Sequence, residues 1–485
     1  MIAQDTASVP CAGQRIDAVI VRSSAPTAAA LRRVALLAAA VSAIHVTTNT
    51  EVIRRFVLLR PGDLCDELRR AESERILRAQ PFIAEASVRA LPDSNGTVLL
   101  DVRTTDEISL VFDVAGHKGN PPLGFVRAGN SNIGGEGLYA AADWRDGGPF
   151  RDGFGARLVD NQLLGRPYIL TAEGHRTPLG SDWLAETLHP FYTDIQQFAW
   201  RARAGGSDDF AQFMNDVNSS HAIRVTRNFF DVGGIVRVGS PGHLSLFGVS
   251  LSRDDERPGD RQVLVTANGF ATDTSSQLLG RYTDHQIARA NALLGIRDIG
   301  FARVHGFDAL TATQDIPVGI QLGTMFGRSV QMLGSRDDDV FTAGDLYIGA
   351  VGHDNALRFQ LEGEGRHSND DHRWDGLLTN ARAVEYFKAS PPNTATASLE
   401  FSGGWWQRLP FNLTFSDHEG GIRGYASSNT PGGQRMVMRL EDREYLGRPF
   451  NLADFGMGVF ADAGRLWAGD IPYGVTTPIR GSVGI

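Results

Sequence analysis

The sequence predicts a small α+β domain followed by a transmembrane antiparallel β-barrel, and two observations carry this prediction. The composition changes near residue 105: all seven Trp and all nine Tyr lie beyond residue 138, whereas the first 105 residues hold only Phe56 and Phe82 as aromatics. From residue 106 to residue 485, segments that alternate apolar and polar residues follow one another, without a convincing amphipathic helix. The two parts are therefore expected to fold as separate units.

Composition and charge exclude several protein classes. The chain has 485 residues, of which 42% are hydrophobic and 21% charged, and this excludes collagen, coiled coil and wholesale disorder. Its formal net charge of −9 gives no electrostatic footprint for general nucleic-acid binding. The longest apolar run, residues 34–44, is far shorter than the ~20 residues of a transmembrane helix. A signal-peptide core is an alternative interpretation of this run, but a strand-like segment precedes it and no convincing cleavage site follows.

The first part is expected to begin with a strand and a helix. Residues 15–21 alternate and then run apolar, as a strand does when one of its faces is covered. The first helix is expected to start at Asn49, with Val52, Phe56 and Leu59 on one face, and to stop at Pro61.

A second helix and two strands complete this part. The helix is expected to start at Asp63, with Leu64, Leu68 and Ala71 at helical spacing. Residues 86–91 and 97–102 predict two strands around a turn at 92–96, which contains an Asn-Gly pair. The predicted order is β-α-α-β-β.

The two cysteines of the chain, Cys11 and Cys65, both lie in the first part. They permit one disulfide in an oxidising compartment, and two unpaired thiols are the alternative. Two cysteines are too few for a Cys-rich metal framework.

The second part alternates with a period of two, for example at residues 357–362, 395–402, 409–416 and 436–441. Polar strings such as 254–260 and 366–371 separate the strands and alternate with tighter Gly-containing connections, as in outer-membrane barrels. A soluble sandwich or propeller also alternates. The length of the strand array, the Trp and Tyr confined to this part, and charged residues such as Arg358 and Glu362 on one strand face favour a barrel with a wet lumen.

Several motifs resemble a known superfamily. Residues 51–55 followed by 61–63, 72–78 and 81–83 resemble a POTRA domain, and Gly421-Ile422-Arg423-Gly424-Tyr425 with 460–464 resembles a motif of the barrels that follow such domains. Residues 161–166 resemble a turn near the start of these barrels, although Pro167 stands where the family has a glycine. Together these motifs are similar to the outer-membrane assembly and translocation barrels, which include BamA, TamA and the two-partner-secretion transporters.

The resemblance implies a domain plan. Residues 1–13 would form a tail, 14–105 one periplasmic POTRA domain, and 106–485 an outer-membrane barrel of 16 strands. A long loop would fold inward, with Arg423, Gly424 and Tyr425 at its tip and Asp462 as the residue of the barrel wall that pairs with the arginine. This pairing is expected because a guanidinium inside a lumen needs a carboxylate in fork geometry. The chain departs from the family in an extra segment at 25–48. It also ends 23 residues after Asp462, where the family has about three more strands, so we expect a truncated C-terminus and an open barrel.

The resemblance also implies a function without a cofactor. Unfolded outer-membrane or secreted polypeptide would add as a strand to the edge of the POTRA sheet and then be inserted into, or exported across, the outer membrane. The alternatives are a passive porin or surface antigen, a two-partner-secretion-type transporter, and a soluble β-rich binding protein. The common hydrolase, zinc-peptidase and nucleotide-binding motifs do not occur in the sequence, so no catalytic residue is expected. His189, His367 and His372 are interpreted as loop or interfacial residues rather than metal ligands.

Overall fold

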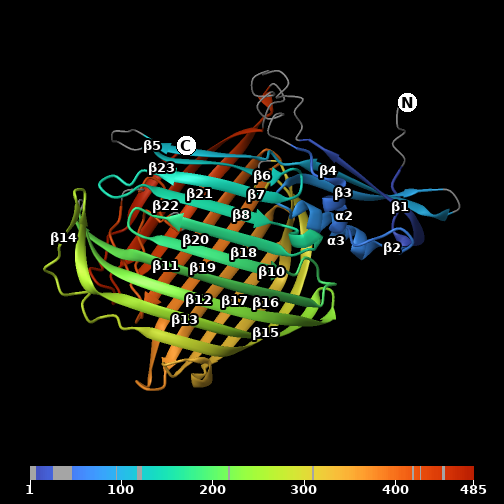
Figure 1. Ribbon diagram of the computed structural model, residues 1–485. Helices are drawn as coiled ribbons and strands as arrows, with labels where there is room; N and C mark the ends of the chain where they lie inside the picture. Colours follow the sequence, from blue (N-terminus) through green and yellow to red (C-terminus); the bar gives the residue numbers. More distant parts are fainter. Residues whose placement is uncertain are drawn as a thin grey trace.

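The structure, a computed structural model, contains an N-terminal α+β domain docked against one end of a large β-barrel (Figure 1). It describes residues 7–25, 46–93, 96–116, 123–216, 219–308, 311–417, 420–425, 428–449 and 454–485. The apolar run at 34–44, which has the alternative interpretation as a signal-peptide core, lies outside these residues. No helix within the described ranges is long and apolar enough to cross a membrane.

The N-terminal domain follows the predicted order with one added strand. Its elements are β1 (Ala12–Ser24), α2 (Thr50–Arg55), β2 (Leu64–Asp66), α3 (Glu67–Arg78), β3 (Ile83–Pro92) and β4 (Val98–Asp106). The sheet has the order β2-β1-β4-β3, in which β1 runs parallel to β4 and β3 antiparallel to it. Asn49 and Asp66 cap α2 and α3 by accepting hydrogen bonds from the first-turn N–H groups of Glu51 and Arg69.

The expected boundaries of the two helices are wrong. The first helix ends at Arg55 and the second begins at Glu67, because Leu64 and its neighbours pair with the start of β1 instead of entering the helix. Leu64 and Leu68, two of the residues at helical spacing, are 62% and 45% exposed. The buried positions of α3 are Ser73, Glu74, Ile76 and Leu77. The apolar spacing that starts at Leu64 therefore does not mark the face that packs.

A compact apolar core and one disulfide hold this domain together. Ile16, Val52, Leu77, Val88 and Leu100 are among the fully enclosed side chains, so both helices and three strands contribute to the core. Cys11 and Cys65 are joined by a disulfide that ties the segment before β1 to β2. Burial of the apolar side chains from each element is what makes the short helices stable.

The second unit is a closed antiparallel barrel. Its strands are β5 (Leu110–Gly116), β6 (Leu123–Ile133), β7 (Leu138–Arg145), β8 (Gly153–Asp160), β9 (Ile169–Arg176), β10 (Ser181–His189), β11 (Phe198–Asp216), β12 (Ser219–Ser240), β13 (His243–Thr266), β14 (Gly269–Thr272), β15 (His285–His305), β16 (Thr313–Ser329), β17 (Asp339–Val351), β18 (Asn355–Ser368), β19 (Arg373–Ser390), β20 (Asn393–Trp405), β21 (Gln434–Gly447), β22 (Phe455–Trp467) and β23 (Arg480–Gly484).

Two expectations about this barrel differ from the structure. The described residues form 19 strands from β5 to β23 rather than 16. One of them, β14, has only four residues and pairs with the C-terminal end of β13, at 263–266, while the earlier part of β13 pairs directly with β15. The ring is closed, with β23 in the place beside β5, so the expectation of an open barrel is wrong (Figure 1). The last strand, β23, is five residues long, and its neighbours in the ring are β22 and β5.

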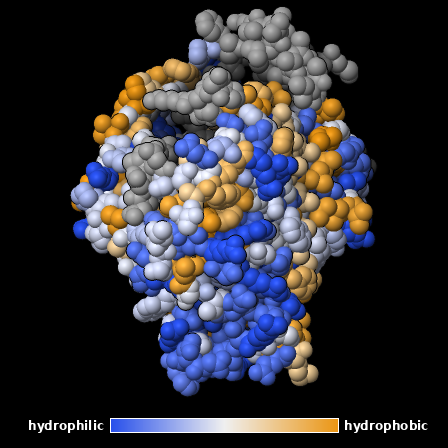
Figure 2. Space-filling view, turned by 60° about the vertical axis from the view of Figure 1, so that its left-hand side comes forward, coloured by the Kyte–Doolittle hydropathy of each residue, from blue (hydrophilic) through white to orange (hydrophobic). Residues whose placement is uncertain are grey.

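Alternation along the strands separates an apolar outside from a charged inside. On β13, Phe247, Val249 and Leu251 are 49%, 70% and 47% exposed on the outer face. Figure 2 shows hydrophobic residues on the flanks of the molecule and hydrophilic residues gathered over the lower part of the same face. Arg358 and Glu362 on β18 lie on the opposite face from Leu357 and Leu361, as the alternation predicts. The arrangement is that of a barrel whose outer surface is apolar and whose lumen is polar.

The predicted strand at 409–416 is not a strand. Within 406–433, the described residues form only an isolated bridge between Leu413 and Gly432, and the segment connects β20 to β21 as a long loop. Leu413 and Phe415 alternate with polar neighbours because the loop crosses the lumen, where Phe415 packs with Ile422, Val437 and Leu466 while polar groups meet charged residues of the wall. Alternation alone does not distinguish these two situations.

Candidate functional site

The tip of the 406–433 loop is pinned to the barrel wall by Arg423. Its Nε lies 2.9 Å from Oδ2 of Asp462 and its Nη2 lies 2.7 Å from Oδ1, so the guanidinium donates to both carboxylate oxygens. The main-chain N–H of Arg423 donates to Asp462 Oδ2 as well, at 3.1 Å. The Asp462 side chain is fully buried and that of Arg423 is 36% exposed. The structure thus brings together the two residues that the family resemblance implied, in the fork geometry that a guanidinium inside a lumen requires.

Other wall residues complete the environment of Arg423. Nη1 lies 2.6 Å from Glu441 Oε2 on β21, and the guanidinium carbon lies 3.7 Å above the centre of the Phe460 ring. Arg439, also on β21, donates to the carbonyl oxygen of Gly421 at 2.6 Å. One cation therefore faces two carboxylates and an aromatic face, which together offset the loss of hydration inside the barrel.

Gly424 and Tyr425 carry the loop toward the last strand. Gly424 has a φ of +85°, in the left-handed region where a side chain would strain the backbone. The turn lets the Tyr425 hydroxyl donate to the carbonyl oxygen of Gly481 on β23 at 3.2 Å, while its ring packs edge-on against Phe415. The four predicted motif residues Arg423, Gly424, Tyr425 and Asp462 thus link the loop to β22 and β23.

Further ion pairs along the loop were not identified from the sequence. At its start, Arg408 lies 3.1 Å from Asp375 and 3.4 Å from Asp339. Just after the loop, Arg435 of β21 donates to Asp417 at 2.5 Å and to the Thr414 carbonyl oxygen at 2.6 Å. Each pair joins residues on different elements, so no spacing rule indicates them.

A cavity of about 1020 Å³ lies beside the pinned loop, between it and strands β18 to β21. Arg382, Glu400 and Arg439 line it as a row of opposite charges, with Arg382–Glu400 at 3.0 Å and Arg439–Glu400 at 2.8 Å. The loop therefore leaves a polar space in the lumen rather than filling it.

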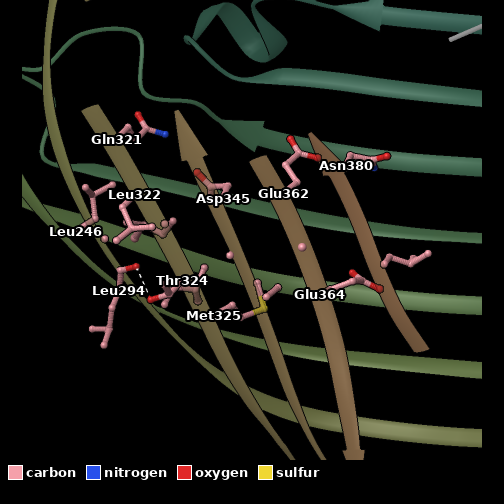
Figure 3. Close-up of a pocket in the computed structure, with 18 of the residues that line it drawn as sticks. Leu246, Leu294, Gln321, Leu322, Thr324, Met325, Asp345, Glu362, Glu364 and Asn380 are labelled. Atoms are coloured by element: carbon pink, nitrogen blue, oxygen red, sulfur yellow. Dashed lines mark hydrogen bonds between the residues drawn. The ribbon is translucent and has the colours of Figure 1, made fainter. Parts of the chain in front are cut away.

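A second cavity, of about 550 Å³, is lined mostly by apolar side chains, with three carboxylates and the Arg237 guanidinium among them. Figure 3 shows the three carboxylates. Asp345 on β17 and Glu362 and Glu364 on β18 lie on neighbouring strands and line the cavity. Within the described part of the chain, neither Asp345 nor Glu362 has an ion-pair partner, whereas Glu364 lies 3.5 Å from Arg366. Gly323 on β16 leaves space for the Asp345 carboxylate, because a Cβ at position 323 would lie 2.2 Å from Asp345 Oδ1.

The N-terminal domain contacts the barrel through the turn that resembles a family motif. Gln162 donates from Nε2 to the Val52 carbonyl oxygen of α2 at 2.8 Å and accepts from Arg55 Nη1 at 3.2 Å. Leu164, in the same turn, has a φ of +56°. The segment 161–166 therefore positions the first helix on the barrel rim.

A second contact lies at the β10–β11 connection. Arg75 of α3 donates to the Tyr192 carbonyl oxygen at 2.5 Å, and the ring of Tyr192 packs edge-on against Phe56. Burial raises the pKa of Tyr192 to about 12. His189, interpreted as interfacial or loop-bound, packs edge-on against Tyr168 at the end of β10.

Comparison with known proteins gives similar structures but no family assignment. No family model matches the sequence, and no curated protein matches it. CdiB from Escherichia coli has a TM-score of 0.45 and 10% identity, with 97% of this chain and 75% of that chain covered. CdiB from Acinetobacter baumannii has a TM-score of 0.44 and 10% identity, covering 97% and 73%. BamA from Haemophilus ducreyi lacking POTRA domains 1–3 has a TM-score of 0.38 and 8% identity, covering 96% and 85%.

Proposed function

We propose that this protein is an outer-membrane barrel that accepts unfolded outer-membrane or secreted polypeptide at its N-terminal domain and assists its insertion or export. The observation that carries the proposal is the loop pinned inside the lumen by Arg423 and Asp462 and joined through Tyr425 to β23. The tip of this loop is held next to β23, which neighbours β5 in the ring. A loop held there is suited to control a path through the lumen or between the first and last strands.

The N-terminal sheet supplies the expected docking place for a polypeptide. Strand β3 pairs with β4 on one side only and forms an edge of the sheet, where an extended chain can add by main-chain hydrogen bonds with little sequence preference. The Cys11–Cys65 disulfide suits an oxidising compartment such as the periplasm, and we place this domain there. The apolar outer face of the barrel suits a lipid bilayer.

Site-specific photocrosslinking tests the proposal in cells that make the full-length protein. A photoreactive amino acid is placed at an exposed side-chain position of the edge strand β3, with the exposed turn residue His353 as the control position. We expect crosslinks from β3 to nascent outer-membrane or secreted proteins and none from the control position. Crosslinks from neither position, in protein that is folded in the outer membrane, would contradict the proposal.

A second candidate is a passive porin or surface antigen, which the polar cavity of about 1020 Å³ favours. A porin needs neither a client-binding edge nor a movable loop. Steady ion conductance in planar bilayers, unchanged when Arg423 is replaced and unaccompanied by client crosslinks, would favour this candidate.

A further inference from the structure

The outer edge of β3 is occupied by side chains of the same domain. The Val88 N–H donates to Glu74 Oε2 at 3.1 Å, and the Val88 carbonyl oxygen accepts from Arg70 Nη1 at 2.5 Å. Two positions further along, the Ala90 carbonyl oxygen accepts from the Val9 N–H at 2.9 Å. Side chains of α3 and one main-chain group from the N-terminal segment thus hold the groups that an added strand would use.

Glu74 is also the main link between this edge and the barrel. Its other oxygen, Oε1, accepts from Arg78 Nη1 at 2.5 Å and from Arg303 Nη2 of β15 at 2.6 Å. Arg78 in turn donates to Asp315 of β16 at 2.6 Å and 3.0 Å. The Glu74 carboxylate is 8% exposed, and burial by itself would raise its pKa, but the hydrogen bonds from Val88 and Arg78 and the charge of Arg303 lower it overall. Oε2 also accepts from Arg70 Nη1 at 3.1 Å. Glu74 is therefore a buried anion with four donors, the Val88 N–H and the side chains of Arg70, Arg78 and Arg303.

The hairpin that Glu74 contacts continues to the pinned loop. Beyond Arg303, the β15–β16 connection brings the carbonyl oxygens of Phe307 and Asp308 within 3.3 Å and 3.2 Å of Arg443 Nη1. Arg443 lies 2.7 Å from Glu441, which binds Arg423. Polar contacts thus run from the edge of β3 to the loop tip.

We propose that adding a polypeptide strand to β3 displaces Glu74 and thereby loosens the docking of the N-terminal domain on the barrel. An added strand lies about 4.8 Å from its neighbour. The Glu74 carboxylate and the Arg70 guanidinium already occupy this space at Val88. One carboxylate cannot leave the edge and keep all its bonds to Arg78 and Arg303, so occupancy of β3 and full docking exclude each other. This inference rests on the proposed strand-binding function of β3.

The test uses the full chain in lipid nanodiscs and a peptide with the sequence of residues 434–447, a barrel strand, carrying benzoylphenylalanine at the position of Tyr445. Spin labels on Asp17→Cys and His353→Cys report the distance between the N-terminal domain and the barrel. Both native cysteines are in the disulfide, so only the introduced thiols react. The variants are Glu74→Gln, Arg303→Gln and, as a matched control, Glu51→Gln, whose carboxylate contacts only the nearby Arg54 among the described ion pairs.

We expect the peptide to crosslink to residues 86–92 and to lengthen and broaden the measured distance in the wild-type chain and in Glu51→Gln. Glu74→Gln should bind the peptide about tenfold more tightly, since a neutral amide cannot hold all four donors. Arg303→Gln should give the longer distance without peptide, and this variant leaves the contacts at Val88 in place if Glu74→Gln does not fold.

Two other results separate the coupling from the function on which it rests. One such result is crosslinking to β3 with equal peptide affinity in the wild-type chain and Glu74→Gln, together with an unchanged spin-label distance. It would overturn the proposed coupling between strand binding and domain docking but leave strand binding itself in place. No crosslink to β3 in any variant would refute the strand-binding edge itself, and the coupling with it.

Discussion

Reversing the charges of Arg423 and Asp462 tests whether their pairing orders the loop. Removing one partner of a buried ion pair costs roughly 3–5 kcal/mol. Because the Arg423 side chain is 36% exposed, solvent screening reduces our expectation to about 2 kcal/mol for Arg423→Asp or Asp462→Arg. Expressed as local opening of the loop, about 2 kcal/mol corresponds to about 30-fold faster amide exchange.

Hydrogen–deuterium exchange of residues 420–425, in protein held in nanodiscs, measures this effect. The double variant, with Arg423→Asp and Asp462→Arg combined, should recover part of the lost protection. Recovery stays partial because Glu441 would then face the aspartate introduced at position 423, and Arg439 the arginine introduced at 462. Arg382→Gln is the matched control, since it breaks a luminal ion pair with Glu400 outside the loop.

Two results would refute the reasoning. If the double variant recovers no protection, direct pairing of Arg423 with Asp462 does not order the loop. If either single reversal changes exchange no more than Arg382→Gln does, the loop is ordered by its other contacts, such as those of Arg435.

Three further predictions concern other parts of the molecule. Cys11→Ser should lower the stability of the N-terminal domain by roughly 2–4 kcal/mol, because the disulfide closes a long loop; amide exchange in the β1–β4 sheet measures it, and no change would show that the core alone holds this domain. The pKa of Glu74 is lowered from 4.5 by its donors, so its carboxylate should stabilise the docked domain fully above pH 4.5 and lose this contribution as the pH falls below that value. The spin-label distance between the domain and the barrel should therefore lengthen only in that acidic range, and a transition at neutral pH would contradict this prediction. Tyr473→Phe removes the hydroxyl contacts of the 468–479 loop with Gln262 of β13 and with Ser275 of the 273–284 segment. It should cost about 1 kcal/mol of loop stability, measured by protease cleavage of the 273–284 segment. An unchanged cleavage rate would mean that the remaining contacts, such as the hydrogen bond from Arg281 to the Asp470 carbonyl oxygen, hold the two loops together without this hydroxyl.

The general plan of the fold follows from patterns that are local in the sequence. A period of two and a one-sided placement of Arg358 and Glu362 are enough to indicate a strand with an apolar and a polar face, because successive residues of a strand point in opposite directions. The β-α-α-β-β order follows in the same way from short segments and turn residues. The pairing of Arg423 with Asp462 was implied by the resemblance of two short motifs to a known family, and such motifs are also local in the sequence.

Only the tertiary structure decided which alternating segments are strands and which charges meet. Residues 409–416 alternate as a strand does, yet they form part of a loop inside the barrel. The side chains that determine their environment come from strands that are distant in the sequence. The same holds for Glu74, which belongs to a charged run in the sequence and in the structure binds both Val88 and Arg303. The physical reason is that burial and ion pairing depend on groups brought together from far along the chain, and local spacing contains no record of those groups.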